Sequence, residues 1–464
     1  MRGVVSAAGY LPAYRLVRSE IRAALGRGGG EGRRAVAGYD EDSTTMATEA
    51  GRLALADIAE PVDAVWMATA SPAYLEKTNA TAVHAALRLD RTAPAWDFGG
   101  AARSGVGALA AALQGTGRTL VVSADVRSGP PSSASESAGG DAGAAVLVGS
   151  GDDVLAELMA TASTSQEFLD RWRLPSDAHA QAWEERFAES VYPGLVDEAW
   201  SAALKHAELT PDDLDRVVVC GTHARAARRV KQGLGVDAAA LVDDLAPVIG
   251  IPGAAQPGLL LASLLEQAQP GELLGVVSLI DGADVIVLRA TDAVAAWSAA
   301  RPVVAQLERS RDLSYAKFLE WRGELATERP NRPPPSRPSA PPSARGDDWK
   351  FGFVGSRDRS SDALHLPPAR VSFQGGAVDD MDLAPMADVG ATVAAVTVDR
   401  LAYSPSPPVV FAVLDFDGGG RLPCELTDVD ADEIAVGARV EMVFRRLYTA
   451  DGVHNYFWKA RPVS

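Results

Sequence analysis

Apolar and polar positions follow one pattern before residue 329 and another after residue 348. In the first part, continuous apolar runs of strand length alternate with helical patterns, as in layered α/β architectures. The segment 41–55 has the apolar stripe of an amphipathic helix, and Asp42 or Ser43 supplies a suitable N-cap. Two other runs, 217–220 and 273–279, are almost continuously apolar, which predicts strands buried on both faces of a sheet, and 119–123 and 144–149 look similar.

A proline-rich stretch separates the two patterns. Between residues 329 and 344 the prolines predict an extended, polyproline-like chain that sustains neither a helix nor a strand ladder. We therefore assign residues 329–348 to a linker and residues 1–328 to the first domain. The part after the linker consists of short runs rich in β-branched and aromatic residues, with Gly and Asp turns between them. This pattern predicts a small all-β barrel or sandwich.

The composition restricts the classes of function. A chain of 464 residues that is 47% hydrophobic is long and apolar enough for more than one core. Its formal net charge of −17 repels phosphate backbones and no basic patch offsets it, so we expect no nucleic-acid partner. The sequence has no signal-like start and no spanning apolar segment, so we expect a soluble, cytoplasmic protein without a membrane partner. Cys220 and Cys424 are the only cysteines, which excludes a disulfide framework or a multi-cysteine metal site.

Three stretches of the first part resemble bacterial and archaeal hydroxymethylglutaryl-CoA synthases, and together they cover most of residues 1–325. The resemblance implies a thiolase-like α/β fold, duplicated and five-layered (αβαβα), that forms a homodimer and takes an acyl-CoA ligand. The stretches are similar to the family's first long helix, its mid-chain insert and the end of its fold: 40–50, 168–173 with 185–187 and Tyr192, and 315–323.

The resembled family works through a cysteine thiolate that accepts the acyl group, a glutamate that moves the proton, and a histidine and an asparagine that hold the carbonyl oxygen. In this sequence Ala102 stands at the cysteine position and Ala70 at the glutamate position. Ile251 replaces the asparagine, and only the histidine is retained, as His223. Because such groups act as one unit, we expect no ordinary cysteine-based condensation.

Two side chains remain as candidate catalytic groups. Ser104 carries the hydroxyl nearest to the vacated cysteine position, but a serine nucleophile needs an adjacent base, and a serine at a helix start commonly caps backbone N–H groups instead. His223 either polarises a thioester or aldol carbonyl or is hydrogen-bonded to neighbouring backbone. Four basic residues that follow it form either a solvated helix face or a site for the phosphates of CoA: Arg225, Arg228, Arg229 and Lys231.

After the linker, Phe353–Asp362 and His365–Gly376 look like the zinc-ribbon entry of a family of OB-fold proteins that accompany thiolases. The resemblance divides this part into a degenerate ribbon at 349–376 and an OB-fold domain at 377–464, and in that family the OB-fold domain docks on a thiolase-type subunit. Four residues other than cysteine occupy the family's zinc-ligand positions, so we expect a metal-free loop: Asp358, Ser361, Ser372 and Gly375.

Three functions fit these observations, and none requires a covalently bound cofactor. The first is a subunit that handles acyl-CoA in a C–C bond-forming or bond-cleaving complex with a separate thiolase-type partner. The second is a stand-alone CoA-thioester aldolase or retro-aldolase, which stabilises an enolate through His223 and a hydroxyl such as Tyr74 or Tyr315. The third is a homodimeric scaffold without catalytic activity. CoA binding separates the first two functions from the third, and activity without a partner separates the second from the first.

Overall fold

The computed structural model describes residues 1–463, except for the side chain of Glu185. Ser464, at the end of the predicted OB-fold domain, lies outside the described residues. The chain divides into two compact units that are described separately below. The first unit comprises Met1–Ala37, Asp42–Thr81 and Asp90–Phe318, and the second comprises Gly38–Glu41, Ala82–Leu89 and Leu319–Ser464.

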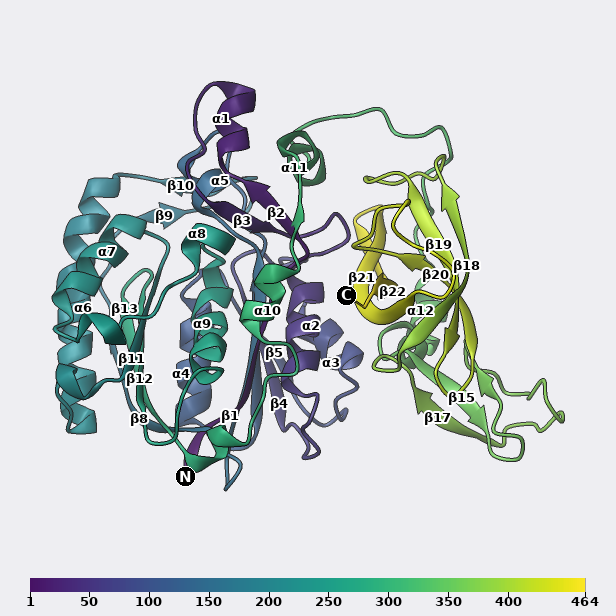
Figure 1. Cartoon of the computed structure of the whole chain (residues 1–464), viewed down its shortest axis with the longest axis horizontal. Coiled ribbons are helices and arrows are strands. Elements are labelled where there is room, and N and C mark those ends of the chain that lie inside the picture. The colour runs from purple at the N-terminus through teal and green to yellow at the C-terminus, as the bar shows by residue number, and fades with distance from the viewer. Residues whose placement is uncertain (464) are drawn as a thin grey trace. The chain divides into compact units, whose positions relative to one another are not determined.

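The first unit is built on a nine-stranded mixed sheet with the strand order β11-β12-β13-β8-β1-β7-β6-β4-β5 (Figure 1). Its two halves meet where β1 pairs with β8, at Gly3↔Glu157 and Val4↔Ala156. Strands β4, β5 and β6 are parallel to one another in one half, and β11 and β12 are parallel in the other. The strands are β1 Arg2–Tyr10, β4 Ala64–Thr69, β5 Ala95–Gly99, β6 Thr119–Asp125, β7 Ala142–Ser150, β8 Ala156–Thr164, β11 Arg216–Gly221, β12 Leu273–Leu279 and β13 Ala283–Ala290.

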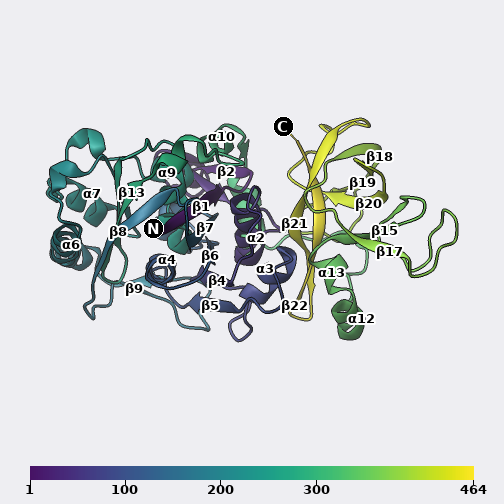
Figure 2. The same cartoon turned by 90° about the horizontal axis from the view of Figure 1, so that it is seen from below.

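Helices form three layers around the two halves of this sheet (Figure 2). Helix α2 packs on β1, β6 and β7, whereas α6 packs on β8 and β13 and α7 packs on α6 and β11. Between them, α4 and α9 contact strands of both halves. This arrangement confirms the predicted duplicated, five-layered αβαβα fold. The helices are α2 Ser43–Ala54, α4 Ser104–Gln114, α6 Glu185–Ala207, α7 Ala224–Gly233 and α9 Gln256–Leu265.

Local sequence features explain how these helices begin and how closely they pack. The Asp42 side chain accepts a hydrogen bond from the Thr45 backbone N–H, and the Thr45 hydroxyl oxygen accepts one from the Asp42 N–H, so the predicted N-cap of α2 is confirmed. At the start of α4, a Cβ added to Gly105 would lie 1.9 Å from the Ala254 carbonyl oxygen. Glycine is therefore required where α4 meets the segment that leads into α9.

Smaller elements complete the first unit. Two short sheets have the strand orders β14-β2-β3 and β10-β9. No helix among residues 1–463 is long and apolar enough to cross a membrane. The remaining elements of this unit are α1 Ser19–Leu25, β2 Tyr14–Val17, β3 Arg33–Val36, α5 Ala134–Ala138, β9 Arg171–Trp172, β10 Gln181–Ala182, α8 Ala246–Ile249, α10 Val303–Glu308 and β14 Arg311–Asp312.

The second unit combines a small ribbon sheet, with the order β16-β15-β17, and a closed barrel with the order β18-β19-β20-β22-β21. Tyr456 and Trp458 are 4% and 1% exposed and belong to the barrel core rather than to an interface. The predicted all-β OB-fold barrel is thus confirmed. The strands are β15 Val354–Asp358, β16 Leu364–His365, β17 Met381–Pro385, β18 Ala391–Asp399, β19 Val409–Phe416, β20 Arg421–Leu426, β21 Arg439–Ala450 and β22 Val453–Pro462.

The predicted linker is not extended throughout. Residues Ala340–Arg345 form helix α12, and Asp347–Lys350 form α13. Helix α12 carries its prolines in the first turn, where a missing N–H costs no intrahelical hydrogen bond and the fixed φ angle suits the helix. The expectation that prolines exclude a helix between residues 329 and 344 was therefore wrong at its C-terminal end.

Candidate functional site

A cavity of about 250 Å³ opens in the first unit at the carboxyl ends of the strands of both halves. Loops that follow β4, β5, β6, β11 and β12 contribute to it, together with the segment around β9. In mixed α/β sheets this edge is the common place for ligands. The lining residues are Ala70, Pro72, Leu75, Gly100, Ala101, Ala102, Arg127, Arg171, Trp172, Arg173, Leu174, Pro175, Ala180, Thr222, Ile280 and Asp281.

The structure brings together two of the positions that the sequence analysis identified as vacated. Ala70 follows β4 and Ala102 precedes α4, and both line this cavity. Ile251, at the asparagine position, is buried but is not among the lining residues, so it does not close the cavity. The two alanines leave open space where longer side chains would project.

The Asp125 carboxylate holds the lining loop after β4 and the segment that leads into α9. One of its oxygens accepts hydrogen bonds from the backbone N–H groups of Ala70 and Ser71, at 2.7 and 3.1 Å, and from the hydroxyls of Thr69 and Ser71. The other accepts from the Ala254 N–H at 2.8 Å. Asp125 is fully buried, and sequence reasoning missed it. The available signal was an aspartate at the end of an apolar strand, where parallel strands present polar groups to a ligand edge.

Arg103 fixes the start of α4 to the opposite half of the unit. Its guanidinium forms an ion pair with Asp284 on β13, with an N–O distance of 2.8 Å, and donates to the carbonyl oxygens of Asp281 and Thr164. These contacts use most of the donors of the guanidinium. Arg103 does not line the cavity itself. It supports the cavity wall by holding Asp281, which does.

The two candidate catalytic groups lie beside the cavity rather than in its lining. His223 is the N-cap of α7, and its Nδ1 accepts a hydrogen bond from the Ala226 N–H at 3.1 Å. A neutral His223 with this acceptor carries its proton on Nε2. The Ser104 hydroxyl donates to the Gly99 carbonyl oxygen at 3.2 Å and caps no backbone N–H of α4.

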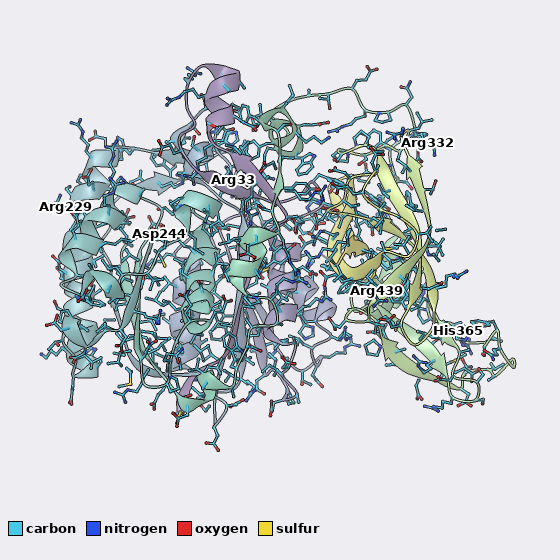
Figure 3. The ribbon with its side chains drawn as sticks, in the orientation of Figure 1. Arg33, Arg229, Asp244, Arg332, His365 and Arg439 are labelled. Atoms are coloured by element: carbon cyan, nitrogen blue, oxygen red, sulfur yellow. The ribbon has the colours of Figure 1, made fainter. Side chains whose placement is uncertain are left out.

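The predicted basic residues lie on α7, which starts directly after a lining residue, Thr222. Arg225, Arg228 and Arg229 are exposed, and Figure 3 shows Arg229 on this helix at the periphery of the unit. Lys231 instead forms an ion pair with Asp244, with an N–O distance of 2.7 Å. Arg228 and Arg229 are consequently available to a ligand, whereas Lys231 is occupied.

Other potential nucleophiles and hydroxyls are placed elsewhere. Burial raises the pKa of the Cys220 thiol well above its ordinary value and that of Cys424 to about 12, so both remain protonated near neutral pH. Neither Tyr74 nor Tyr315 lines the cavity. The Tyr315 hydroxyl is hydrogen-bonded to the buried Glu136 carboxylate at 3.2 Å. The two hydroxyls that the aldolase alternative assigned to assist His223 therefore do not lie in the cavity lining.

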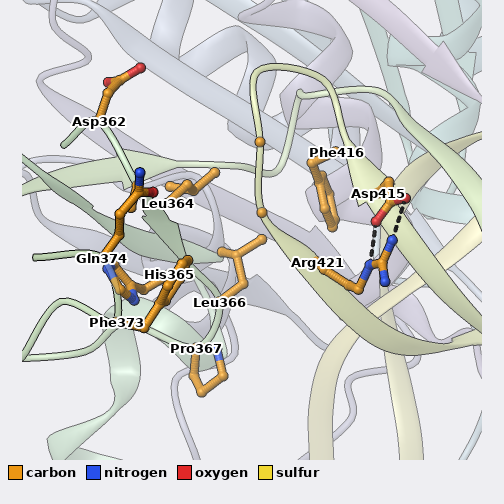
Figure 4. A pocket seen from close by; sticks show the side chains of 13 residues that line it. Asp362, Leu364, His365, Leu366, Pro367, Phe373, Gln374, Asp415, Phe416 and Arg421 are labelled. Carbon is orange, nitrogen blue, oxygen red and sulfur yellow. Dashed lines mark hydrogen bonds and ion pairs between the residues drawn. The ribbon is translucent and has the colours of Figure 1, made fainter.

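Figure 4 shows another cavity, of about 540 Å³, that lies entirely in the second unit between the ribbon and strands β19 and β20. Arg421 on its wall is paired with Asp415 through two hydrogen bonds. His365 is 5% exposed and lies edge-on against the Phe373 ring, with the ring centroids 4.6 Å apart. The one arginine among the described residues that line this second cavity, Arg421, is already paired with Asp415. We therefore place the candidate functional site in the first unit.

The ribbon residues at the zinc-ligand positions do not fit a zinc ion. The Asp358 carboxylate accepts hydrogen bonds from the Ser361 hydroxyl at 2.6 Å and from the Ser360 N–H at 2.9 Å. Hydrogen bonds from Ser361 and Ser372 lower the pKa of Asp358 to about 2. Serine hydroxyls and one carboxylate are poor ligands for structural zinc. In the described residues, no group of three His, Cys, Asp or Glu side chains is placed to hold a metal.

These features define the class of the protein: a thiolase-like α/β unit followed by an OB-fold barrel. The first part is similar to the hydroxymethylglutaryl-CoA synthases of Thermoplasma volcanium and Methanothermobacter thermautotrophicus, each 27% identical. These alignments cover 70% of this chain and 98% and 99% of the two relatives. The chain is therefore hydroxymethylglutaryl-CoA synthase-like over its first part. Residues 385–445 match the family described as "ChsH2, C-terminal OB-fold domain".

Solved structures agree with this assignment at the level of the fold. A hydroxymethylglutaryl-CoA synthase complexed with CoA aligns with a TM-score of 0.59 and 18% identity, covering 70% of this chain and 92% of that structure. The 3-oxoacyl-(acyl carrier protein) synthase III of Pseudomonas aeruginosa aligns with a TM-score of 0.56 and 23% identity, covering 62% and 98%.

Proposed function

We propose that the chain binds an acyl-CoA at the cavity bounded by Ala70 and Ala102, and that it acts without an acyl-enzyme intermediate as one subunit of a C–C bond-forming or bond-cleaving complex. The observation that carries the proposal is the cavity itself. The positions of two vacated catalytic groups, 32 residues apart in sequence, still border one open space rather than a packed core. Such a space fits an acyl group that is held but not covalently bound.

The surroundings of the cavity support this proposal. Two solved structures of similar fold, a hydroxymethylglutaryl-CoA synthase and MvaS, hold CoA and 3-hydroxy-3-methylglutaryl-CoA respectively. In this chain the exposed Arg228 and Arg229 would hold the phosphates of CoA, because they lie on the helix that starts at the rim of the cavity. His223 would donate from Nε2 to the thioester carbonyl and so polarise it. We also propose that two copies of the chain form a homodimer and that this homodimer acts together with a separate thiolase-type partner.

Calorimetric titration with acetyl-CoA and a longer acyl-CoA tests the CoA part of the proposal. We expect the Arg228→Ala/Arg229→Ala variant to bind both ligands about ten- to a hundredfold more weakly, because two charge-assisted contacts to phosphate are lost. Arg289→Ala, which removes an exposed arginine from β13, is the matched control and should leave the affinity unchanged. A folded protein that binds neither ligand contradicts the proposal and favours the scaffold alternative.

Filling the cavity tests the acyl part separately. Ala102→Phe places a ring in the space that the acyl group would occupy, and Ala102 is itself 8% exposed. The variant should still bind free CoA but should lose the extra affinity for acyl-CoA. Unchanged acyl-CoA binding by a correctly folded variant would place the acyl group elsewhere.

The role as a subunit is tested by activity. Aldol cleavage of a 3-hydroxyacyl-CoA should be undetectable with the purified chain and should appear when a thiolase-type partner is added. Cleavage by the chain alone, lost in His223→Ala, would instead support the stand-alone aldolase.

A further inference from the structure

The charged groups in the cavity lining are unbalanced. Three arginines, Arg127, Arg171 and Arg173, line it together with a single acid, Asp281. This excess of positive charge occurs in a chain whose formal net charge is −17. A concave site with an excess of one sign concentrates ligands of the opposite sign. The imbalance therefore points to an anionic group in the ligand.

Arg171 lacks a complete set of protein partners. Its guanidinium donates to the Ser135 hydroxyl at 3.0 Å, but its Nε is buried and has no hydrogen-bond partner among the described residues. Burial, together with the neighbouring charge of Arg127, lowers the pKa of Arg171 to about 10. A buried donor without an acceptor is unfavourable, and an oxyanion would both accept the hydrogen bond and offset the charge.

The other two arginines are positioned to share the same ligand. The Arg127 guanidinium has one ion-pair contact among the described residues, with Asp125 at 3.8 Å, and the Asp125 oxygens already accept hydrogen bonds from two loops. Arg173 donates to the Ala70 carbonyl oxygen at 3.0 Å, which fixes its guanidinium beside the vacated glutamate position. Neither contact neutralises the arginine fully.

Asp281 is a weak counter-charge for these arginines. Burial and the nearby Asp170 raise the pKa of the Asp281 carboxyl. Its backbone is held from both sides, since its N–H donates to the Tyr192 hydroxyl and its carbonyl oxygen accepts from Arg103. The acid therefore has a fixed place on the cavity wall, and the other acids that act on these arginines, Asp125 and Asp170, do not line the cavity.

We infer that the cavity selects acyl groups that end in a carboxylate, which Arg127 and Arg171 bind. This inference rests on the proposed function, because it assigns the acyl end of the CoA thioester to the cavity. The volume of about 250 Å³ is slightly below the range of about 300–1,000 Å³ for ligand pockets, which favours a short dicarboxylic chain. The phosphates of CoA are left to the exposed arginines of α7.

Two thioesters of similar size test this inference. Succinyl-CoA ends in a carboxylate, and 4-methylpentanoyl-CoA carries two methyl groups in place of its oxygens. We expect succinyl-CoA to bind at least about tenfold more tightly, and the preference to disappear in Arg171→Gln and in Arg127→Gln. Arg289→Gln is the control for removal of an exposed positive charge and should keep the preference. Thermal denaturation establishes that each variant is folded.

The possible results have distinct meanings. Equal binding of the two thioesters by the unaltered chain overturns the inference and leaves the proposed function intact. Equal weakening of both thioesters in Arg171→Gln also overturns it, because the arginines would then hold a phosphate of CoA. Failure of both thioesters and of free CoA to bind contradicts the proposed function itself. Succinyl-pantetheine, which has no phosphate, should retain the sensitivity to Arg171→Gln.

Discussion

A single carboxylate joins one loop of the cavity wall to the segment that leads into α9. Asp125 accepts hydrogen bonds through one oxygen from the loop after β4 and through the other from Ala254. In Asp125→Asn, an NH2 group would face backbone N–H donors. We expect the free energy of unfolding to fall by about 3 kcal/mol, since a buried donor loses its acceptor next to another donor. Urea denaturation measures the loss. Asp63→Asn, an exposed aspartate that accepts from the Arg118 N–H, should cost less than about 1 kcal/mol.

A second carboxyl makes the stability of the first unit depend on pH. Burial raises the pKa of Glu266 to about 7, although the Val303 N–H donates to both of its oxygens. Because folding raises this pKa, the folded chain holds the proton more tightly than the unfolded chain. The stabilising contribution of the protonated Glu266 carboxyl is complete below its ordinary pKa of 4.5, and it is lost as the pH rises through its folded-state pKa of about 7. Glu266→Gln should therefore stabilise the protein at pH 8 and have little effect at pH 5. Urea denaturation at both values checks this, and an equal effect at both contradicts it.

Among the elements, the ribbon is held by a hydrogen-bonded carboxylate, Asp358. Asp358 accepts from Ser360 and Ser361 where the resembled family has zinc ligands. These hydrogen bonds lower the pKa of Asp358 to about 2, so they stabilise the loop above pH 4 and are lost as the pH falls toward 2. In Asp358→Asn we expect the Ser360 amide to exchange about tenfold faster. Asp362→Asn, which alters an exposed acid paired with Arg357, is the control and should leave that amide unchanged.

The elements also show how far the sequence could be interpreted. Continuous apolar runs and the Asp42 cap depend on neighbours in the chain, and they predicted β6, β7, β11, β12 and α2 correctly. The positions of Ala70 and Ala102 followed from resemblance, and the fold brings both to one cavity. The role of Arg171 depends on a partner that lies distant in sequence, so no local pattern predicted it. For Asp125 the chain offered only its place at the end of an apolar strand, because its partner Ala254 is also distant in sequence. The helix at Ala340–Arg345 was missed because the prediction assumed that prolines exclude a helix wherever they occur. Prolines in the first turn, as here, are compatible with a helix.

At the scale of the whole molecule, one compact unit is assembled from segments distant in sequence. The second unit includes Gly38–Glu41, and the fully buried Lys459 lies 2.9 Å from Asp40 in this unit. Arg445, also buried, pairs with Glu41 at 3.1 Å. Burial acts to raise the pKa of Asp40, but the charges of Lys459 and Arg445 lower it below its ordinary value. A segment near residue 40 is therefore part of the electrostatic core of the barrel, and the stability of that barrel depends on it.

A double-mutant cycle in the full chain tests this dependence. Asp40→Leu and Lys459→Met should each lower the free energy of unfolding of the second unit by about 3 kcal/mol, because each takes one partner from a fully buried charge. Among the described residues, Lys459 then keeps only Glu425 as an ion-pair partner, at 2.5 Å, and Asp40 keeps only Arg445, at 3.7 Å. The double variant should cost much less than the sum, since it removes both charges together. Hydrogen exchange of the β21 and β22 amides measures the effect in this unit alone. Arg439→Met, which breaks the exposed pair with Asp417, is the control and should cost less than about 1 kcal/mol. Additive costs for Asp40 and Lys459 would mean that the two charges do not stabilise one another, and that the segment at residue 40 is held by its other contacts.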